Sequence, residues 1–261
     1  VTSIVGPNGC GKSTLLKALS RTMPLLGGAV YLNGAAIATM PTAEVARQMA
    51  LLPQSPQAPA GLTVGELVAL GRYPHQRGFG RLTDDDRRII DWALSITHLD
   101  GLAERPIDAL SGGQRQRIGI ARALAVEPEL IIADEPVSAL DVSIQAQVLN
   151  LLHQLQKEFN LTYIFVAHDL SVVEHISDRV GVMYLGNFVE VGDKRKLYSN
   201  PLHPYTQGLL KSIPRLDQDS SERLFNIPGS VPDLSEMPKG CRFCTRCTEA
   251  CSKCFDQEPG L

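Results

Sequence analysis

The sequence predicts an α/β fold in which helices cover a parallel sheet. Two continuous apolar runs, 129–136 (ELIIADEP) and 161–169 (LTYIFVAHD), end in ionisable side chains, which is typical of parallel strands buried on both faces. The order strand, helix, strand indicates a right-handed crossover and a doubly wound domain. The helix is predicted from apolar residues that recur at helical spacing between the two runs: Ile144, Val148, Leu151, Leu152, Leu155 and Phe159.

The other elements are predicted from apolar runs and from helix-start signals. Residues 1–5 favour a strand, and a helix is expected to begin near Ser13. Residues 29–34 (AVYLNG) favour a strand that ends in an Asn-Gly turn. Residues 83–96 begin with a threonine and three aspartates, which is typical of a helix N-terminus.

Composition limits the functional classes. The chain has 261 residues, a net charge of -3 and 44% hydrophobic residues, which is enough for one domain with an appendage. The near-neutral charge gives no electrostatic reason to expect nucleic acid as a partner. No apolar run approaches the ~18 residues of a membrane span, and no secretory signal is evident, so we expect a cytoplasmic protein. Because the chain begins at Val1 inside a predicted strand, we expect a natural segment before it.

The character of the sequence changes near residue 200. Residues 201–261 predict one helix, then a stretch rich in proline and glycine (226–240), then a cysteine cluster. We therefore expect an appendage with little core of its own. Such clustering in a cytoplasmic protein favours metal or redox chemistry over structural disulfides.

A glycine-rich stretch follows the first predicted strand. Residues 6–13 fit the pattern G-x-x-x-x-G-K-[ST], in which glycines let backbone N–H groups face phosphate oxygens. Lys12 is suited to the β and γ phosphates and Ser13 to Mg²⁺. The alternative is a chance strand-turn-helix junction, but the strand before and the helix after favour a nucleotide. The predicted binding residues are Gly6, Asn8, Gly9, Cys10, Gly11, Lys12, Ser13 and Thr14.

Three ionisable residues lie at predicted carboxyl ends of strands, where doubly wound sheets bind ligands. Asp134 is suited to holding Mg²⁺, and Glu135 is suited to polarising an attacking water. The alternative is that both carboxylates are solvated and cap the next helix. His168 ends the second run, although a histidine alone is more often structural.

The stretch LSGGQ (110–114) predicts a second anion site. Ser111 is a natural N-cap, and Gly112 and Gly113 expose backbone N–H groups. One triphosphate does not need two such sites in one small domain. Two chains facing each other head to tail would close two nucleotide sites at once. The alternative is an ordinary capped helix.

Together these motifs resemble the ATPase subunits of ABC transporters, which are P-loop NTPases. The chain matches that family in order through residues 6–14, LLPQ ending in Gln54, LSGGQ, LIIADE, SALD (138–141) and His168. The resemblance implies that Ser111, Gly113 and the neighbouring Gly112 and Gln114 contact the γ phosphate of a partner's ATP. It also implies that Gln54 senses Mg²⁺ and the membrane subunit, that His168 contacts the γ phosphate, and that Asp141 helps to form the dimer seam.

The resemblance also implies a domain plan. Residues 1–200 would be the ABC ATPase domain, with a helical insert at about 55–125, and residues 201–261 an appendage like that of oligopeptide transporters. The family's usual first strands, with an aromatic that stacks on adenine, are absent before Val1. We therefore expect this chain to hold the phosphates better than the adenine.

The two halves of the chain resemble different subfamilies. Residues 6–90 resemble importers of ferric siderophores, haem or cobalamin, whereas residues from 134 onward resemble oligopeptide, dipeptide and nickel importers. The longer match favours peptide import, with siderophore, haem or cobalamin import as the alternative. The resemblance implies an ATPase on the cytoplasmic face of the cell membrane. Its partners would be a second ATPase subunit, identical or different, the permease subunits and, indirectly, a substrate-binding protein.

The tail cysteines suggest a separate hypothesis. Cys241, Cys247 and Cys254 fall where peptide-importer ATPases commonly have cysteines, and some of those proteins resemble iron–sulfur carriers. With Cys244 or Cys251 as a fourth ligand, the thiolates would suit a [4Fe–4S] cluster or Zn²⁺. The alternative is free thiols. Two other functional classes are an ABC ATPase without transport and a nucleotide-responsive iron–sulfur module.

Overall fold

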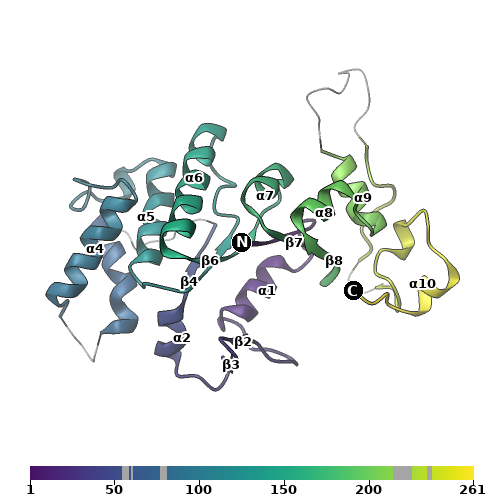
Figure 1. Cartoon of the computed structure of the whole chain (residues 1–261), viewed down its shortest axis with the longest axis horizontal. Helices are drawn as coiled ribbons and strands as arrows, with labels where there is room; N and C mark the ends of the chain where they lie inside the picture. Colours follow the sequence, from purple (N-terminus) through teal and green to yellow (C-terminus); the bar gives the residue numbers. More distant parts are fainter. Residues whose placement is uncertain (55–58, 60, 77–80, 214–224, 234–236) are drawn as a thin grey trace. The chain divides into compact units, whose positions relative to one another are not determined.

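The computed structural model describes residues 1–54, 59, 61–76, 81–213, 225–233 and 237–261 (Figure 1). The chain divides into two compact units. The middle unit contains residues 13–166, and the terminal unit contains residues 1–12 and 167–261. None of the described helices combines the length and the apolar character that a bilayer crossing requires.

Three parallel strands form the centre of the middle unit. They are β4 (Met49–Leu52), β5 (Leu130–Asp134) and β6 (Thr162–Val166), in the order β4-β5-β6. Helix α6 (Val142–Phe159) connects β5 to β6 and buries the face that carries Val148, Leu151 and Leu155. This is the strand-helix-strand unit that the apolar pattern predicts, and Asp134 ends β5 opposite Val166 of β6.

A small hairpin precedes this sheet in the chain. Strands β2 (Tyr31–Leu32) and β3 (Ala35–Ala36) are antiparallel, and Asn33 and Gly34 between them both have positive φ, 50° and 80°. Positive φ at both central residues is what a tight hairpin turn requires, so the Asn-Gly prediction is confirmed. Helix α2 (Thr42–Gln48) follows, and Val45 packs with Leu32 in a small core.

The described elements of the middle unit between β4 and β5 are helical. They are α3 (Val64–Ala69), the 3₁₀ turn η1 (Leu70–His75), α4 (Asp84–Ile96), the 3₁₀ turn η2 (Ile107–Ala109) and α5 (Gly112–Leu124). In Figure 1, α4, α5 and α6 lie side by side. Thr63 and Thr83 begin α3 and α4 with capping boxes, which confirms the helix start predicted at residue 83. The bounds of the helical insert at 55–125 stay a prediction, and residues 55–58, 60 and 77–80 of that range lie outside the described residues.

A buried ion pair joins these helices. Arg72 is 4% exposed, and its Nε donates a hydrogen bond of 2.8 Å to Oδ1 of Asp86, which is 6% exposed. A second guanidinium nitrogen of Arg72 donates to the Ala125 carbonyl and to Glu127, both at 2.8 Å. Mainly the Arg72 hydrogen bond, and then the Thr83 amide, lower the pKa of Asp86 to about 2.

The terminal unit contains three further strands. Strand β1 (Thr2–Val5) pairs in parallel with β7 (Arg179–Tyr184), which pairs antiparallel with β8 (Asn187–Asp193). Its helical elements are α7 (Leu170–Ile176), α8 (Lys194–Ser199), α9 (Pro204–Lys211), the 3₁₀ turn η4 (Cys244–Arg246) and α10 (Ser252–Asp256). Helix α1 (Lys12–Leu19) begins at the last residue of this unit's first segment, and its other residues belong to the middle unit.

The cysteine-rich tail packs on the rest of the terminal unit through aromatic rings. Phe243 is 3% exposed, and its ring centroid lies 5.3 Å from those of Tyr184 and Tyr205. Arg246 reaches the Tyr184 hydroxyl at 3.3 Å and the Pro228 carbonyl at 2.9 Å. The domain boundary at residue 201 stays a prediction, and residues 214–224 and 234–236 lie outside the described part of the chain.

Candidate nucleotide-binding site

The glycine-rich loop lies between β1 and α1 and depends on glycine for its backbone path. Gly9 and Gly11 have φ values of 77° and 101°, in the region that other residues rarely adopt. A Cβ atom on Gly6 would lie 2.2 Å from the carbonyl oxygen of Met183, so the strand end passes too close for any side chain. These positions explain why glycines occur at this spacing.

Lys12 turns back into the loop that precedes it. Its side chain is buried, and Nζ donates hydrogen bonds to the carbonyl oxygens of Gly6 at 2.8 Å and Pro7 at 3.0 Å. The ammonium charge is therefore held beside the loop backbone, where the sequence predicts phosphate oxygens. Asn8 and Gly9 are exposed at the loop tip.

Cys10 supports the loop from its buried side. The side chain is 2% exposed, and burial raises the pKa of its thiol. Its carbonyl accepts a hydrogen bond of 2.8 Å from the Gly186 amide, in the turn that joins β7 and β8. Because the thiol is buried, only backbone groups of Cys10 can face a ligand. The support from Met183 and Gly186 was not found by sequence reasoning, because no local pattern indicates which distant strand touches the loop.

Two oxygen ligands suited to magnesium meet inside the middle unit. Ser13 Oγ donates a hydrogen bond of 3.3 Å to Oδ1 of Asp134 at the end of β5. Hydroxyl and carboxylate oxygens are the ligands that Mg²⁺ prefers, so the donor set fits this ion. Ser13 and Thr14 are exposed at the start of α1.

Glu135 has an unusual backbone conformation. Its φ is 46°, and its amide donates a hydrogen bond of 3.0 Å to the Val166 carbonyl of β6. A left-handed residue other than glycine is strained by on the order of 1–3 kcal/mol and persists only where its surroundings enforce it. Here the β6 carbonyl and the Ser138 hydroxyl, which donates to the Glu135 carbonyl at 3.0 Å, hold the backbone.

Gln54 contacts the turn that follows β5 and carries Glu135. Its side-chain amide donates a hydrogen bond of 3.1 Å to Ser138 Oγ, so Ser138 connects Gln54 to the backbone of Glu135. Sequence reasoning included Ser138 only as the first letter of SALD and gave it no role. The sequence could have indicated this role, because Ser138 lies three residues after Glu135. A serine hydroxyl at that spacing can donate a hydrogen bond to the earlier backbone carbonyl.

The LSGGQ stretch begins α5. Ser111 Oγ accepts from the Gln114 amide at 3.3 Å, and Gln114 Oε1 accepts from the Ser111 amide at 3.0 Å, which forms a capping box. A Cβ on Gly113 would lie 2.5 Å from a methyl carbon of Ile144, so this glycine lets α5 approach α6 closely. Asp141 Oδ1 accepts from the Ile144 amide at 3.0 Å and caps α6. Ser111, Gly112 and Asp141 are exposed.

His168 lies in the terminal unit and is exposed. It follows Ala167, whose amide donates to the Ile4 carbonyl at 3.4 Å, and precedes Asp169, which caps α7. The position after β6 agrees with the prediction that this residue follows a strand end. Its role toward a phosphate stays a prediction.

The five tail cysteines are free thiols in the terminal unit. Burial raises the pKa of Cys244 and of Cys247, and the nearby thiols of Cys241 and Cys254 add to the effect. The Sγ atoms of Cys251 and Cys254 lie 3.4 Å apart. Within the described ranges, no three or more His, Cys, Asp or Glu side chains form a group that could hold a metal ion. The structure therefore does not bring together the ligand set predicted for [4Fe–4S] or Zn²⁺.

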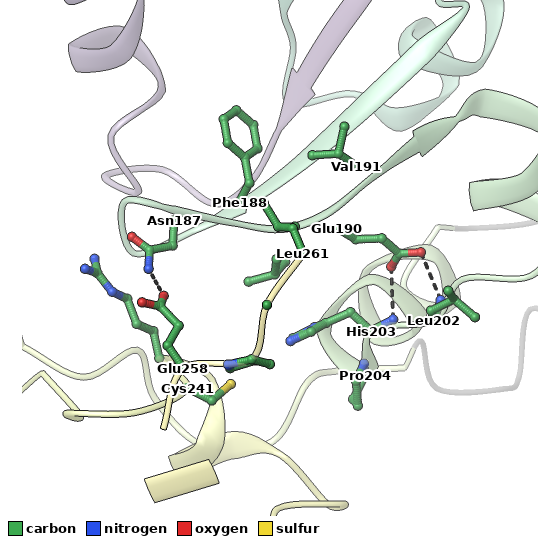
Figure 2. A pocket seen from close by; sticks show the side chains of 14 residues that line it. Asn187, Phe188, Glu190, Val191, Leu202, His203, Pro204, Cys241, Glu258 and Leu261 are labelled. Atoms are coloured by element: carbon green, nitrogen blue, oxygen red, sulfur yellow. Dashed lines mark hydrogen bonds between the residues drawn. The ribbon is translucent and has the colours of Figure 1, made fainter. Parts of the chain in front are cut away.

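The terminal unit also contains a cavity of about 350 Å³ lined by β8, the start of α9 and the tail. Figure 2 shows Glu190 accepting hydrogen bonds from the backbone amides of Leu202 and His203, at 2.9 and 3.0 Å. Burial lowers the pKa of His203, whose Nδ1 accepts from the Tyr205 amide at 3.1 Å. The Glu190 carboxylate and His203 Nδ1 are thus already hydrogen-bonded to backbone amides, so we assign the cavity no catalytic role.

Comparisons with known proteins agree with both resemblances. Residues 1–138 match the family described as ABC transporter, and residues 189–254 match the oligopeptide/dipeptide transporter C-terminal region. The iron(3+)-hydroxamate import ATP-binding protein FhuC of Bacillus subtilis (strain 168) is 49% identical over 219 residues, which cover 84% of this chain and 79% of FhuC. The oligopeptide transport ATP-binding protein AppF of the same strain is 44% identical over 265 residues, which cover 98% of this chain and 80% of AppF.

A solved structure supports the fold. A chain from a metal-chelate type ABC transporter in an inward-facing conformation superimposes with a TM-score of 0.68 at 33% identity, covering 80% of this chain and 76% of that one. The family match spans the glycine-rich loop, LSGGQ and the β5 carboxylates. This chain therefore belongs to the ATP-binding subunits of ABC transporters, whose hydrolysis of ATP powers transport.

Proposed function

We propose that this chain powers peptide import from the cytoplasmic face of the cell membrane. The support for peptides is that AppF, an oligopeptide transport protein, aligns over 98% of the chain. The match to the oligopeptide/dipeptide C-terminal region at residues 189–254 adds to it. A second candidate, ferric hydroxamate import, is favoured by the higher identity to FhuC over a shorter alignment.

The hydrogen bond between Ser13 and Asp134 is the observation that best supports the proposed chemistry. Loop amides and Lys12 would bind the phosphates, and Ser13, the next residue in the chain, would bind Mg²⁺ with Asp134 and Gln54. The ion, when bound, neutralises charge on the β and γ phosphates. The protein supplies position and electrostatics, because phosphoryl transfer needs little covalent help.

Glu135 is the proposed general base. A carboxylate that orients and polarises the attacking water is expected to contribute about 10²–10⁴-fold to the rate. The backbone of Glu135 is strained and is held in place by Ser138. Such strain is expected where the fold must aim a side chain, here the proposed base, in one particular direction. His168 would contact the γ phosphate and stabilise charge as the bond to the leaving group breaks.

The exposed start of α5 is the proposed contact for a second subunit. Ser111, Gly112, Gly113 and Gln114 would meet the γ phosphate held by the partner, and Asp141 would lie at the seam between subunits. Support comes from the exposure of Ser111 and Asp141 and from the N-terminal end of α5, which favours negative charge. Closure of the dimer would move the permease subunits, which receive substrate from a binding protein.

A metal centre in the tail does not enter this proposal. Zinc sites and [4Fe–4S] clusters each need four ligands, and the described side chains form no group of even three that could hold an ion. The thiols present do not fit these groups, so no step of the function is assigned to them.

Uptake into proteoliposomes tests the transported substrate. The chain is reconstituted with the permease and binding protein of its transporter, and labelled oligopeptide or labelled ferric hydroxamate is offered with ATP. We expect ATP-dependent uptake of peptide and none of hydroxamate, because the tail match is to peptide transporters. Uptake of hydroxamate alone would reject the peptide assignment and support the second candidate.

A further inference from the structure

We propose that Cys251 and Cys254 are a redox site that forms an intramolecular disulfide by exchange with a small-molecule disulfide. Their Sγ atoms lie 3.4 Å apart, in contact but not bonded. The sequence spacing is C-x-x-C, and the nucleotide-binding role of the chain does not use either thiol. Among the described residues, these two cysteines form a close pair and are not part of a metal-binding group.

The local backbone needs only a small adjustment to accommodate a disulfide. Cys251 immediately precedes α10, and the Cys254 amide donates a hydrogen bond of 2.9 Å to the Cys251 carbonyl. Residues three apart in a helical turn have Cβ atoms about 5–6 Å apart, whereas a disulfide needs about 3.5–4.5 Å. Forming the bond therefore takes side-chain rotation together with a small tightening of this turn, from sulfur atoms that are already 3.4 Å apart.

The tail holds this turn in place on one side. The Cys254 carbonyl accepts from the Cys241 amide at 2.8 Å, and the Phe255 carbonyl accepts from the Gly240 amide at 3.1 Å. A Cβ on Gly240 would lie 2.5 Å from the Cys254 carbonyl oxygen, so the two segments touch closely. The Cys254 thiol therefore lies on a backbone that hydrogen bonds hold in place, while the Cys251 thiol faces solvent.

Exposure assigns the order of attack. Cys251 is exposed and Cys254 is half-buried, whereas Cys241 and Cys244 are 8% and 3% exposed. A thiol must be reachable to attack a dissolved disulfide, so Cys251 is the thiol that reacts first. Cys254 lies beside it and reacts second.

The chemistry balances with a small disulfide, RSSR, as the oxidant. Cys251 loses its proton, and its thiolate attacks one sulfur of RSSR, which forms a mixed disulfide and releases one thiolate RS⁻. Cys254 then loses its proton, attacks the Cys251 sulfur and releases the second RS⁻. The protein loses two electrons and two protons, and RSSR becomes two RSH. A dithiol such as dithiothreitol reverses both steps.

Thiol counting on the full chain tests the proposal. The reduced protein is incubated with oxidised glutathione, quenched with acid, and its thiols are titrated after denaturation. We expect six free thiols before treatment, as in the structure, and a loss of two after it, with no glutathione retained. Trypsin cleaves after Arg246 and Lys253, so the disulfide would join the fragments 247–253 and 254–261.

Variants distinguish the pair from its neighbours. Because fragment 247–253 also contains Cys247, the variant Cys247→Ser serves as the matched control and should keep the joined fragments. Cys251→Ser should lose them, and Cys254→Ser should instead retain one glutathione on Cys251. Thermal melting of each reduced variant checks that its fold is intact.

Three results would overturn the proposal. Joined fragments that persist in Cys251→Ser would show that another cysteine is the partner of Cys254. Six thiols that survive oxidised glutathione would show that the pair does not exchange. Iron or zinc bound in equimolar amount, with the thiols reactive only after its removal, would show that the tail holds a metal.

Discussion

At the scale of single residues, the candidate site depends on backbone positions that few residue types tolerate. Glu135 holds a left-handed conformation against its steric preference, and Gly6 lies where any Cβ would meet the Met183 carbonyl. The pattern in the sequence predicted the residue types of the loop. It could not predict Ser138 as the link between Gln54 and Glu135, because that contact joins residues 84 positions apart.

The role of Glu135 gives a prediction at this scale. In Glu135→Gln, ATP binding should be kept while the rate of hydrolysis falls by about 10²–10⁴-fold, because only the base is lost. The measurement is release of inorganic phosphate beside equilibrium binding of a fluorescent ATP analogue. Glu158→Gln, an exposed change on α6, is the matched control and should hydrolyse ATP at the normal rate. Undiminished hydrolysis in Glu135→Gln would show that the base is another group.

Among the helices and strands, apolar periodicity and capping residues predicted the elements that depend on their own local sequence. The strands β5 and β6, the helix α6 between them and the start of α4 all agree with the apolar spacing and the capping residues. The buried Arg72 was not predicted, since it lies in a stretch rich in Pro, Gly and charge that indicates a loop. Its burial depends on Asp86 and Ala125, which only the packing of η1, α4 and α5 brings together.

The Arg72–Asp86 pair gives a prediction on pH. The pKa of Asp86 is lowered from 3.8 to about 2 in the folded chain, so its charge stabilises the fold fully above pH 3.8. This contribution should be lost as the pH falls from 3.8 through about 2. Asp86→Asn leaves Arg72 without its buried partner and should lower the free energy of unfolding by about 3–5 kcal/mol at pH 7.

Urea unfolding at several pH values measures this contribution. The difference between the wild type and Asp86→Asn should be constant from pH 7 to pH 5 and shrink as the pH falls below 3.8, because Asp86 then binds a proton in the unfolded chain before it does so in the folded chain. The exposed Asp91→Asn on the same helix is the control and should change little. A difference that grows with acid would contradict the assigned direction of the pKa shift.

At the scale of the whole molecule, the tail and the phosphate loop belong to the same unit. Arg242 donates a hydrogen bond to the Leu185 carbonyl, and the next residue, Gly186, donates through its amide to the Cys10 carbonyl of the loop at 2.8 Å. The cysteine-rich tail and the phosphate loop therefore bind to neighbouring residues of the turn between β7 and β8. Sequence reasoning treated the tail as a separate appendage because no periodic pattern indicates contacts across the chain.

The loop and LSGGQ are proposed to serve one nucleotide held between two subunits. Sedimentation velocity of Glu135→Gln with Mg²⁺ and ATP tests this arrangement, because this variant should keep the bound triphosphate. We expect a dimer with ATP, and a monomer both without ATP and in the Lys12→Ala, Glu135→Gln double variant. A chain that binds ATP and yet stays monomeric, both alone and when mixed with a second ATPase subunit of the same transporter, would contradict this prediction.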